Sequence, residues 1–291
     1  MKKIIILFII CFFCIWEVFP QIRKINRSRT IDAIENAVII DSGNVRIWYA
    51  LNARDIDKQD SYEDLQRLDI GLQLSKYYSF FTFNNDSLFV DWQKKNPNAK
   101  GKPHYLGIKH NYSGWCEYHY SEYIKNFGSN VFIEYTRMPA FLEMLNGKCE
   151  EQMPVQNWEI LEDTLTVTGY LCQKANCRFR GRNYTAWFAV DIPIQNGPWK
   201  FGGLPGLILK VYDSDKLYVF ECTKIEHFTK KFPITLNHYF NKYKNIEREK
   251  LLKYYKKIYE DFFNFAGINL IHEDGSPFIW KKIPYNPLEL E

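Results

Sequence analysis

Hydrophobic and polar residues alternate with a period of two along several stretches of the chain, which is the pattern of half-buried β-strands. The first clear case spans residues 38–52, where Val45, Ile47, Tyr49 and Leu51 fall on one face. Further strands are predicted at 72–83, 131–136, 158–161, 165–179, 183–190, 207–212 and 217–225. Because short turns separate several of these strands, sequence neighbours should pair in an antiparallel meander.

Helical patterns accompany the predicted strands. Residues 61–68 begin with a serine and carry two acidic residues in the first turn, which predicts a short helix, and 86–95 is a second short candidate. One long helix is predicted at 245–266, with Gly267 as a natural stop. Its apolar stripe is formed by Leu251, Tyr255, Ile258, Phe262 and Phe265. The stripe predicts that this helix packs on one face of the sheet, and docking on a partner is the alternative.

These elements together predict a mainly β (α+β) protein. The expected architecture is an antiparallel meander that forms a curved open sheet or half-barrel, with the long C-terminal helix packed on it. The chain has 291 residues and no linker in its middle, so a single domain over 21–291 is expected. Aromatic residues make up 17% of the chain, and many of these rings must lie in a core or line a cleft.

Residues 1–20 have the composition of a secretory signal peptide. Lys2 and Lys3 supply the positive charge, and an apolar run from Ile4 to Trp16 follows. That run is shorter than the about 20 residues that span a membrane, and no later run reaches that length. Cleavage is expected near residues 20–21, with an uncleaved N-terminal anchor as the alternative. Export would place the chain in an oxidising compartment, where disulfides persist.

The cysteines of the exported chain are odd in number, so at least one stays free or pairs outside the chain. They are Cys116, Cys149, Cys172, Cys177 and Cys222. In one continuous strand, Cys172 and Cys177 lie on opposite faces and too far apart for a disulfide. The disulfide candidates are therefore Cys149, Cys172 and Cys222, with Cys172 bonded to one of the other two. Buried free thiols are the alternative interpretation.

A loop rich in proline and glycine, residues 191–206, separates two predicted strands. Proline restricts φ and glycine opens angles closed to other residues, so the loop should follow one defined path. Its apolar residues are Ile192, Ile194, Trp199, Phe201 and Leu204. They make it too apolar for disorder. It is either a packed structural loop at one end of the sheet or a rim that contacts a ligand or partner.

Residues in and beside this loop are the candidate binding residues: Arg180, Arg182, Trp187, Trp199 and Lys200. A guanidinium can hold a carboxylate or phosphate with two parallel hydrogen bonds. An aromatic ring beside a cation, as at 199–200, can meet a ligand. The structural alternatives are ion pairs of the two arginines with Asp191 or Glu221, and burial of Trp199 as a loop anchor.

Other kinds of chemistry are poorly supported. The histidines between 104 and 119 lack metal-ligand spacing, so neither a metal site nor a cofactor is predicted. The chain has no G-x-S-x-G, P-loop or dinucleotide-binding motif. Its net charge is +4, without a basic stripe interleaved with aromatic residues, so nucleic acid is not an expected partner.

One motif carries a family resemblance. It consists of Gly203, Leu204, Pro205, Gly206, Leu207 and Ile208, and it resembles the motif that names the GLPGLI family of Bacteroidetes. Segments at 169–175, 179–182 and 192–201 are similar to the family's run before that motif, and 285–289 is similar to its usual ending. The resemblance is densest over 158–225, and Cys177 departs from the usual pattern.

This resemblance implies a GLPGLI-type β-rich domain over 21–291. It also implies export to the periplasm or outer cell envelope of a Gram-negative bacterium, without an established reaction. The sequence favours a non-catalytic accessory module that binds an apolar small molecule or lipid on the concave sheet face, or an outer-membrane protein. The alternative is an envelope hydrolase or peptidase, in which His, Asp or Glu converges with a nucleophile in one cleft.

Overall fold

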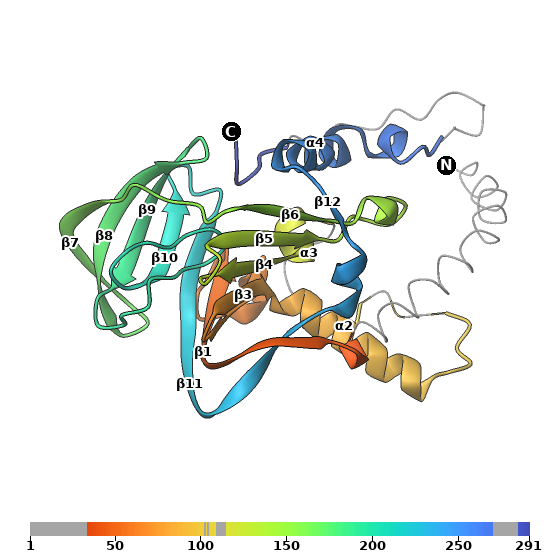
Figure 1. Ribbon diagram of the computed structural model, residues 1–291, viewed down its shortest axis with the longest axis horizontal. Helices are drawn as coiled ribbons and strands as arrows, with labels where there is room; N and C mark the ends of the chain where they lie inside the picture. The colour runs from red at the N-terminus through yellow and green to blue at the C-terminus, as the bar shows by residue number, and fades with distance from the viewer. Residues whose placement is uncertain (1–33, 102, 104, 109–114, 270–284) are drawn as a thin grey trace, which may run out of the picture.

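A computed structural model describes residues 34–101, 103, 105–108, 115–269 and 285–291. The predicted signal peptide, residues 1–20, lies outside the described residues. The described chain forms one 12-stranded sheet in the order β12-β6-β5-β4-β3-β2-β1-β11-β10-β9-β8-β7 (Figure 1). None of the helices in these ranges combines the length and the hydrophobicity that a membrane crossing requires.

The strands are β1 (Val38–Leu51), β2 (Asp64–Gly71), β3 (Leu74–Ser79), β4 (Ser121–Asn126), β5 (Val131–Thr136), β6 (Gly147–Gln152), β7 (Glu159–Val167), β8 (Tyr170–Phe179), β9 (Arg182–Ala189), β10 (Leu207–Asp213), β11 (Val219–Leu236) and β12 (Lys244–Asn245). The α-helices are α2 (Phe80–Lys95), α3 (Glu117–Tyr120) and α4 (Arg248–Phe265). Short 3₁₀ turns are η1 (Gln59–Ser61), η2 (Glu143–Leu145) and η3 (His238–Lys242).

The sheet consists of two antiparallel meanders joined by the first strand. Strands β2 to β6 pair in sequence order, as do β7 to β11, and β1 lies between β2 and β11. Among the described strands only the two-residue β12 pairs in parallel, with β6 at one edge. The prediction of a mainly β protein with an open antiparallel sheet is confirmed. The long β1–β11 pairing, 14 and 18 residues, unites both meanders in one core.

Two local predictions were wrong or incomplete. Residues 61–68 do not form a helix, because β2 starts at Asp64 and its Leu68 lies between Ile47 of β1 and Tyr77 of β3. Pairing in the sheet overrides the helix-start signal there. The predicted strand 72–83 stops at Ser79, whose hydroxyl accepts a hydrogen bond from the Thr82 amide at 3.1 Å and caps α2.

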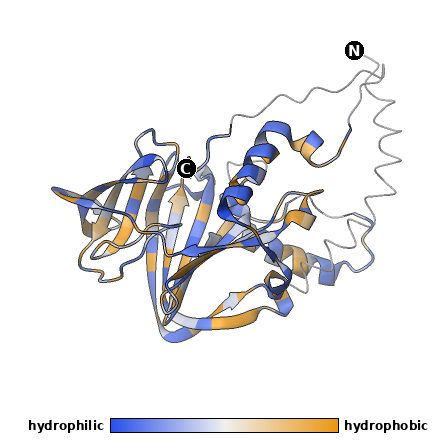
Figure 2. Cartoon of the chain, turned by 45° about the horizontal axis from the view of Figure 1, so that its top comes forward, coloured by the Kyte–Doolittle hydropathy of each residue, from blue (hydrophilic) through white to orange (hydrophobic). Residues whose placement is uncertain are grey.

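The predicted strand 165–179 is also divided. Thr168 and Gly169 adopt φ angles of 49° and 82°, and this turn separates β7 from β8. Along these strands hydrophobic and hydrophilic residues alternate (Figure 2). In β8, β9 and β10 apolar side chains are buried in the core, whereas the edge strand β7 is mostly exposed.

The two faces of the sheet are covered by different helices. Paired residues Ile47, Leu68, Tyr77, Tyr123 and Glu134 define what we call the inner face. The helix α4 packs there, since the Tyr255 hydroxyl donates to Glu134 Oε1 at 2.7 Å. The prediction of a C-terminal helix packed on the sheet is confirmed. The helix α2 covers the opposite, outer face, where the Trp48 and Phe80 rings lie 4.8 Å apart.

The loop 191–206 fills the inner face. Its Trp199, Phe201 and Leu204 side chains are buried in the main core. The buried Lys125 amine of β4 donates to Asn196 Oδ1 at 2.8 Å, to the Gly197 carbonyl oxygen at 3.1 Å and to the Phe201 carbonyl oxygen. The concave face expected to hold an apolar ligand is therefore occupied by the chain's own side chains.

Candidate functional site

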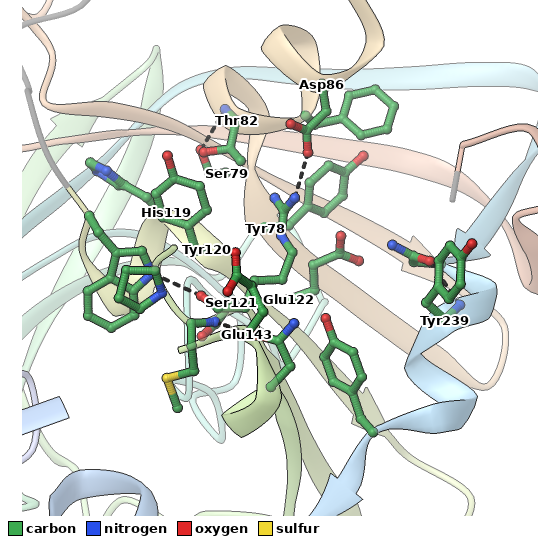
Figure 3. A pocket seen from close by; sticks show the side chains of 18 of the residues that line it. Tyr78, Ser79, Thr82, Asp86, His119, Tyr120, Ser121, Glu122, Glu143 and Tyr239 are labelled. Carbon is green, nitrogen blue, oxygen red and sulfur yellow. Dashed lines mark hydrogen bonds and ion pairs between the residues drawn. The ribbon is translucent and has the colours of Figure 1, made fainter. Parts of the chain in front are cut away.

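A cleft of the described chain lies over β3 and β4, between α2, η2 and η3. Its cavity volume is about 870 Å³, within the range of small-ligand sites. Side chains from all five elements point into it (Figure 3). Residues as distant in sequence as Lys76 and Thr235, 159 positions apart, therefore meet here, which no local motif can indicate.

Two ion pairs line the cleft. Lys76 Nζ of β3 lies 2.6 Å from Glu122 Oε2 of β4, and the same amine donates to the Thr235 carbonyl oxygen at 2.7 Å. Arg137, just after β5, reaches Asp86 Oδ2 of α2 at 2.7 Å. Each pair joins separate elements of the cleft wall. Because each pair is neutral, the two pairs add no net charge to the wall.

Aromatic rings, one acidic residue and two exposed lysines, Lys242 and Lys244, complete the cleft. The rings are Tyr78, Phe83, Trp115, Tyr120, Tyr239 and Tyr243. The Lys76 amine lies 4.5 Å from the centre of the Tyr78 ring, and the Arg137 guanidinium lies 5.5 Å from that of Tyr120. Glu143 of η2 is half-buried and makes no ion pair with a described residue. The lining thus offers ring faces, hydrogen-bond donors and acceptors, and one available carboxylate.

A serine, an aspartate and a histidine converge at one end of this cleft. The Ser79 hydroxyl donates to Asp64 Oδ1 at 2.8 Å, and His119 Nε2 lies 3.9 Å from Asp64 Oδ2. In a Ser-His-Asp triad the histidine lies between the other two, whereas here the aspartate does. All three side chains are buried, and burial raises the pKa of Asp64 well above its ordinary value. This group supports the cap of α2 and is not arranged to activate a nucleophile.

Four of the five predicted binding residues lie elsewhere and gather around the chain's own C-terminus, residues 285–291, called the tail below. Lys200 Nζ contacts Glu151 at 2.5 Å and also Glu289 of the tail. Arg180 contacts Glu151 and lies 3.6 Å from Glu289. The Lys200 side chain is only 2% exposed, so an external ligand has no access to it.

Arg182 and Trp199 complete this group. Arg182 contacts Asp213 Oδ2 at 3.1 Å and donates to the Pro287 carbonyl oxygen at 2.9 Å. Trp199 is buried, 3% exposed, with its ring 5.2 Å from that of Phe201. The prediction that these arginines pair with Asp191 or Glu221 was wrong. Arg180 pairs with Glu151 and Arg182 with Asp213, while Glu221 pairs with Lys210. Trp187 lies apart from the group, half-buried on β9, with the Lys174 amine 5.8 Å from its ring centre.

The six motif residues connect the loop to β10. Gly203 has φ of 78°, and a Cβ on Gly206 would lie 2.0 Å from the Ala189 carbonyl oxygen of β9. Leu204, Leu207 and Ile208 are buried, whereas Pro205 is exposed. The Tyr49 hydroxyl of β1 donates to the Ile208 carbonyl oxygen at 2.7 Å. The motif is a packing element that lets the loop pass close to β9 before β10 begins.

The disulfide candidates are not bridged in the structure. Cys149, Cys172 and Cys222 are free and buried, as are the other two cysteines of the described ranges. Burial raises the pKa of Cys172 to about 11 and that of Cys222 to about 12. The buried-thiol interpretation therefore describes the structure. Among the described residues, His, Cys, Asp and Glu side chains form no group able to hold a metal ion.

Sequence reasoning missed the cleft residues Lys76, Asp86, Glu122 and Arg137. A faint signal exists for Lys76, a charged residue within an aromatic-rich predicted strand. Lysine is almost never buried without a partner, so its position implies a carboxylate on a neighbouring strand. That partner, Glu122, lies within residues 103–130, whose pattern predicts no element.

Comparisons with known proteins add a family and a distant likeness. Residues 176–210, which include the six-residue motif, match a family described as "Protein of unknown function (Porph_ging)". A search of curated proteins found no match. A structure of PNGF-II in space group P21 is similar with a TM-score of 0.44 and 14% identity, over 72% of this chain and 32% of that one.

Two further solved structures are similar at a comparable level. PNGF-II in space group C2 has a TM-score of 0.43 and 16% identity, over 74% of this chain and 32% of that one. An uncharacterized conserved protein from Thermus thermophilus has a TM-score of 0.34 and 10% identity, over 71% and 91% of the two chains. This chain spans about a third of the length of the PNGF-II structures. Likenesses this distant carry no argument about activity.

Proposed function

We propose that this chain is an exported GLPGLI-family protein of a Gram-negative cell envelope, with a single domain over 21–291, that binds a ligand in the cleft without transforming it. The six-residue motif within the matched segment supports the family, and the signal-like composition of residues 1–20 supports export. In the group of Ser79, Asp64 and His119 the aspartate, and not the histidine, lies between the other two residues. This arrangement supports a binding role over hydrolysis.

The proposed class of ligand rests on one observation, the pairing of charged side chains among the aromatic rings of the cleft. Fixed cation–carboxylate pairs at Lys76–Glu122 and Arg137–Asp86 present donors and acceptors side by side with little net charge. A hydroxyl group is both donor and acceptor, so it matches such a wall. Sugar rings also carry apolar C–H faces that stack on tyrosine and tryptophan. We therefore favour a neutral oligosaccharide over the lipid that the sequence first suggested.

Native mass spectrometry of the chain purified from its own envelope tests this proposal first. A retained oligosaccharide mass supports it, and a retained peptide would keep the binding role while replacing the ligand class. Calorimetric titration with neutral envelope oligosaccharides follows. Glu143→Gln at the cleft should weaken binding about tenfold, because a charge-assisted hydrogen bond becomes a neutral one.

Glu159→Gln is the matched control, since Glu159 is exposed on the edge strand β7, which lines no part of the cleft. It should bind as the native chain does. The proposal is contradicted if native mass spectrometry shows only the mass of the chain without a ligand and calorimetry detects no heat of binding. Release of a shortened sugar would favour the hydrolase alternative.

A further inference from the structure

The tail lies in a groove formed by the β8–β9 turn, the start of β11, α4 and the loop at residues 199–200. We propose that this groove is a peptide-binding site that also accepts the tail of a second copy of this chain, so that two copies exchange tails. This inference is independent of the cleft and of its ligand.

Side chains of the groove form hydrogen bonds with the backbone of the tail. The Tyr218 hydroxyl donates to the Asn286 carbonyl oxygen at 2.5 Å. Arg182 Nε donates to that of Pro287 at 2.9 Å, and the Tyr184 hydroxyl donates to that of Leu288 at 3.0 Å. Three successive carbonyls are thus bound by side chains of the groove. Hydrogen bonds to the main chain are one recurring source of affinity for an extended peptide.

The groove also selects two side chains. Leu288 is 4% exposed and belongs to the main core. Glu289 is contacted by Lys200, by Arg248 Nε at 2.6 Å and by Arg180 at 3.6 Å. Without the tail, Lys200 and Arg180 share the single carboxylate of Glu151, so the groove favours a replacement carboxylate. The ligand class is an extended peptide with a leucine followed by a glutamate.

The tail is attached to its own groove mainly through side chains. Only one backbone–backbone hydrogen bond joins it to the rest of the described chain, from the Leu290 amide to the Arg180 carbonyl oxygen at 2.9 Å. The connecting residues, 270–284, span at most about 50 Å when extended, which permits the tail to reach a neighbouring molecule.

A second copy is the occupant that satisfies these requirements. It carries the same Leu288 and Glu289, and exchange of identical segments preserves every contact in both molecules. Because the native tail competes at the high effective concentration of a tethered segment, exchange is expected at high protein concentration.

Cross-linking across an exposed contact tests the exchange. Arg178 and Glu291 form a surface ion pair at 2.8 Å, with side chains 66% and 63% exposed. One population carries Arg178→Cys and the other Glu291→Cys, both with Cys11 and Cys14 replaced by serine. After incubation together at high concentration, a short bis-maleimide should yield at least tenfold more mixed dimer than a control pair in which Lys230→Cys replaces Arg178→Cys. Lys230 is exposed in the second half of β11, whereas the tail contact at this strand is made by Tyr218, just before its start.

Leu288→Asp in the Glu291→Cys population should reduce the mixed dimer to the control level, because the donor tail no longer fits. The double variant Arg178→Cys/Glu291→Cys tests whether the tail lies in the groove of its own chain, because both cysteines are then in one molecule. Cross-linking within that variant together with control-level mixed dimer overturns the exchange. If neither the cross-link within one chain nor the mixed dimer forms, the tail does not lie in the groove and the whole proposal is overturned.

A second measurement avoids engineered cysteines. A labelled peptide with the sequence of residues 285–291 should bind the full chain carrying Leu288→Asp, whose own tail is unseated, at least tenfold more tightly than it binds the native chain. If that variant does not fold, hydrogen exchange of the native chain decides. The Leu290 amide should then exchange at least tenfold faster than the β9 and β10 amides. Equal rates would mean that the tail leaves only on global unfolding and would overturn the proposal.

Discussion

Lys200 and Glu289 lie 89 residues apart in the chain and form an ion pair in which neither side chain is more than 7% exposed. The pair joins the proline- and glycine-rich loop to the tail. It shows that a cation proposed as a ligand contact is instead neutralised by the chain itself.

Removal of this buried carboxylate should be costly. We expect Glu289→Ala to lower the free energy of unfolding by about 3–5 kcal/mol. Without Glu289, the buried Lys200 keeps only Glu151, which it shares with Arg180, and the partly buried Arg248 loses its carboxylate. Urea denaturation measures the change. Glu291→Ala is the matched control, since its ion pair with Arg178 is exposed and should contribute less than about 1 kcal/mol. Equal effects of the two variants would contradict the role assigned to Glu289.

Glu117 should make stability depend on pH. Burial raises the pKa of Glu117 to about 7 from an ordinary value of 4.5, against the hydrogen bonds from Tyr259 at 3.0 Å and Tyr285 at 3.2 Å. The folded state then binds more protons between these values, so its contribution is complete below pH 4.5 and is lost as pH rises through 7.

We therefore expect Glu117→Gln to flatten the fall in the free energy of unfolding between pH 4.5 and 7. The two falls in the free energy of unfolding should differ by about 3 kcal/mol across that window. Urea titrations at several pH values measure it, with Glu159→Gln as the control. Identical pH profiles for the native chain and Glu117→Gln would exclude this titration. Glu134, whose pKa burial also raises, remains in both and cancels in the comparison.

Gly206 should tolerate no side chain. A Cβ there would lie 2.0 Å from the Ala189 carbonyl oxygen and 2.6 Å from its carbon, and β9 backbone cannot move away without breaking its pairing. We expect Gly206→Ala to cost at least about 2 kcal/mol in thermal or urea unfolding. Gly101→Ala, with no atom within 4 Å of its added Cβ, should change stability by less than about 0.5 kcal/mol. A native-like Gly206→Ala would disprove this close approach.

The cysteines of the described ranges should be inert in the native state. All five are buried, and burial raises the pKa of Cys149, Cys177 and Cys222 to about 12. Because the thiolate is the reactive form, a thiol reagent should label them only after denaturation. Mass spectrometry of the denatured, unreduced chain should show five additions from these residues. Fewer additions, with a loss of two hydrogens per missing pair, would establish a disulfide.

The sequence predicted the sheet better than the helices. Alternation at Val45, Ile47, Tyr49 and Leu51 identified β1 because side-chain direction in a strand depends only on the backbone. The helix expected at 61–68 was wrong because capping residues are a weak local preference that sheet pairing overrides. Local signals therefore succeed where one face of a strand is buried and fail where a neighbouring strand decides.

By itself, the sequence determined the antiparallel architecture, the packed face of α4 and the apolar character of the loop at 191–206, because each follows from periodicity within a short segment. Tertiary structure alone decided what the charged residues do. Lys200 meets Glu289 of the tail, and Lys76 meets Glu122 across β3 and β4. An ion pair depends on the position of two side chains in space, and a linear spacing of 89 residues carries no information about that distance.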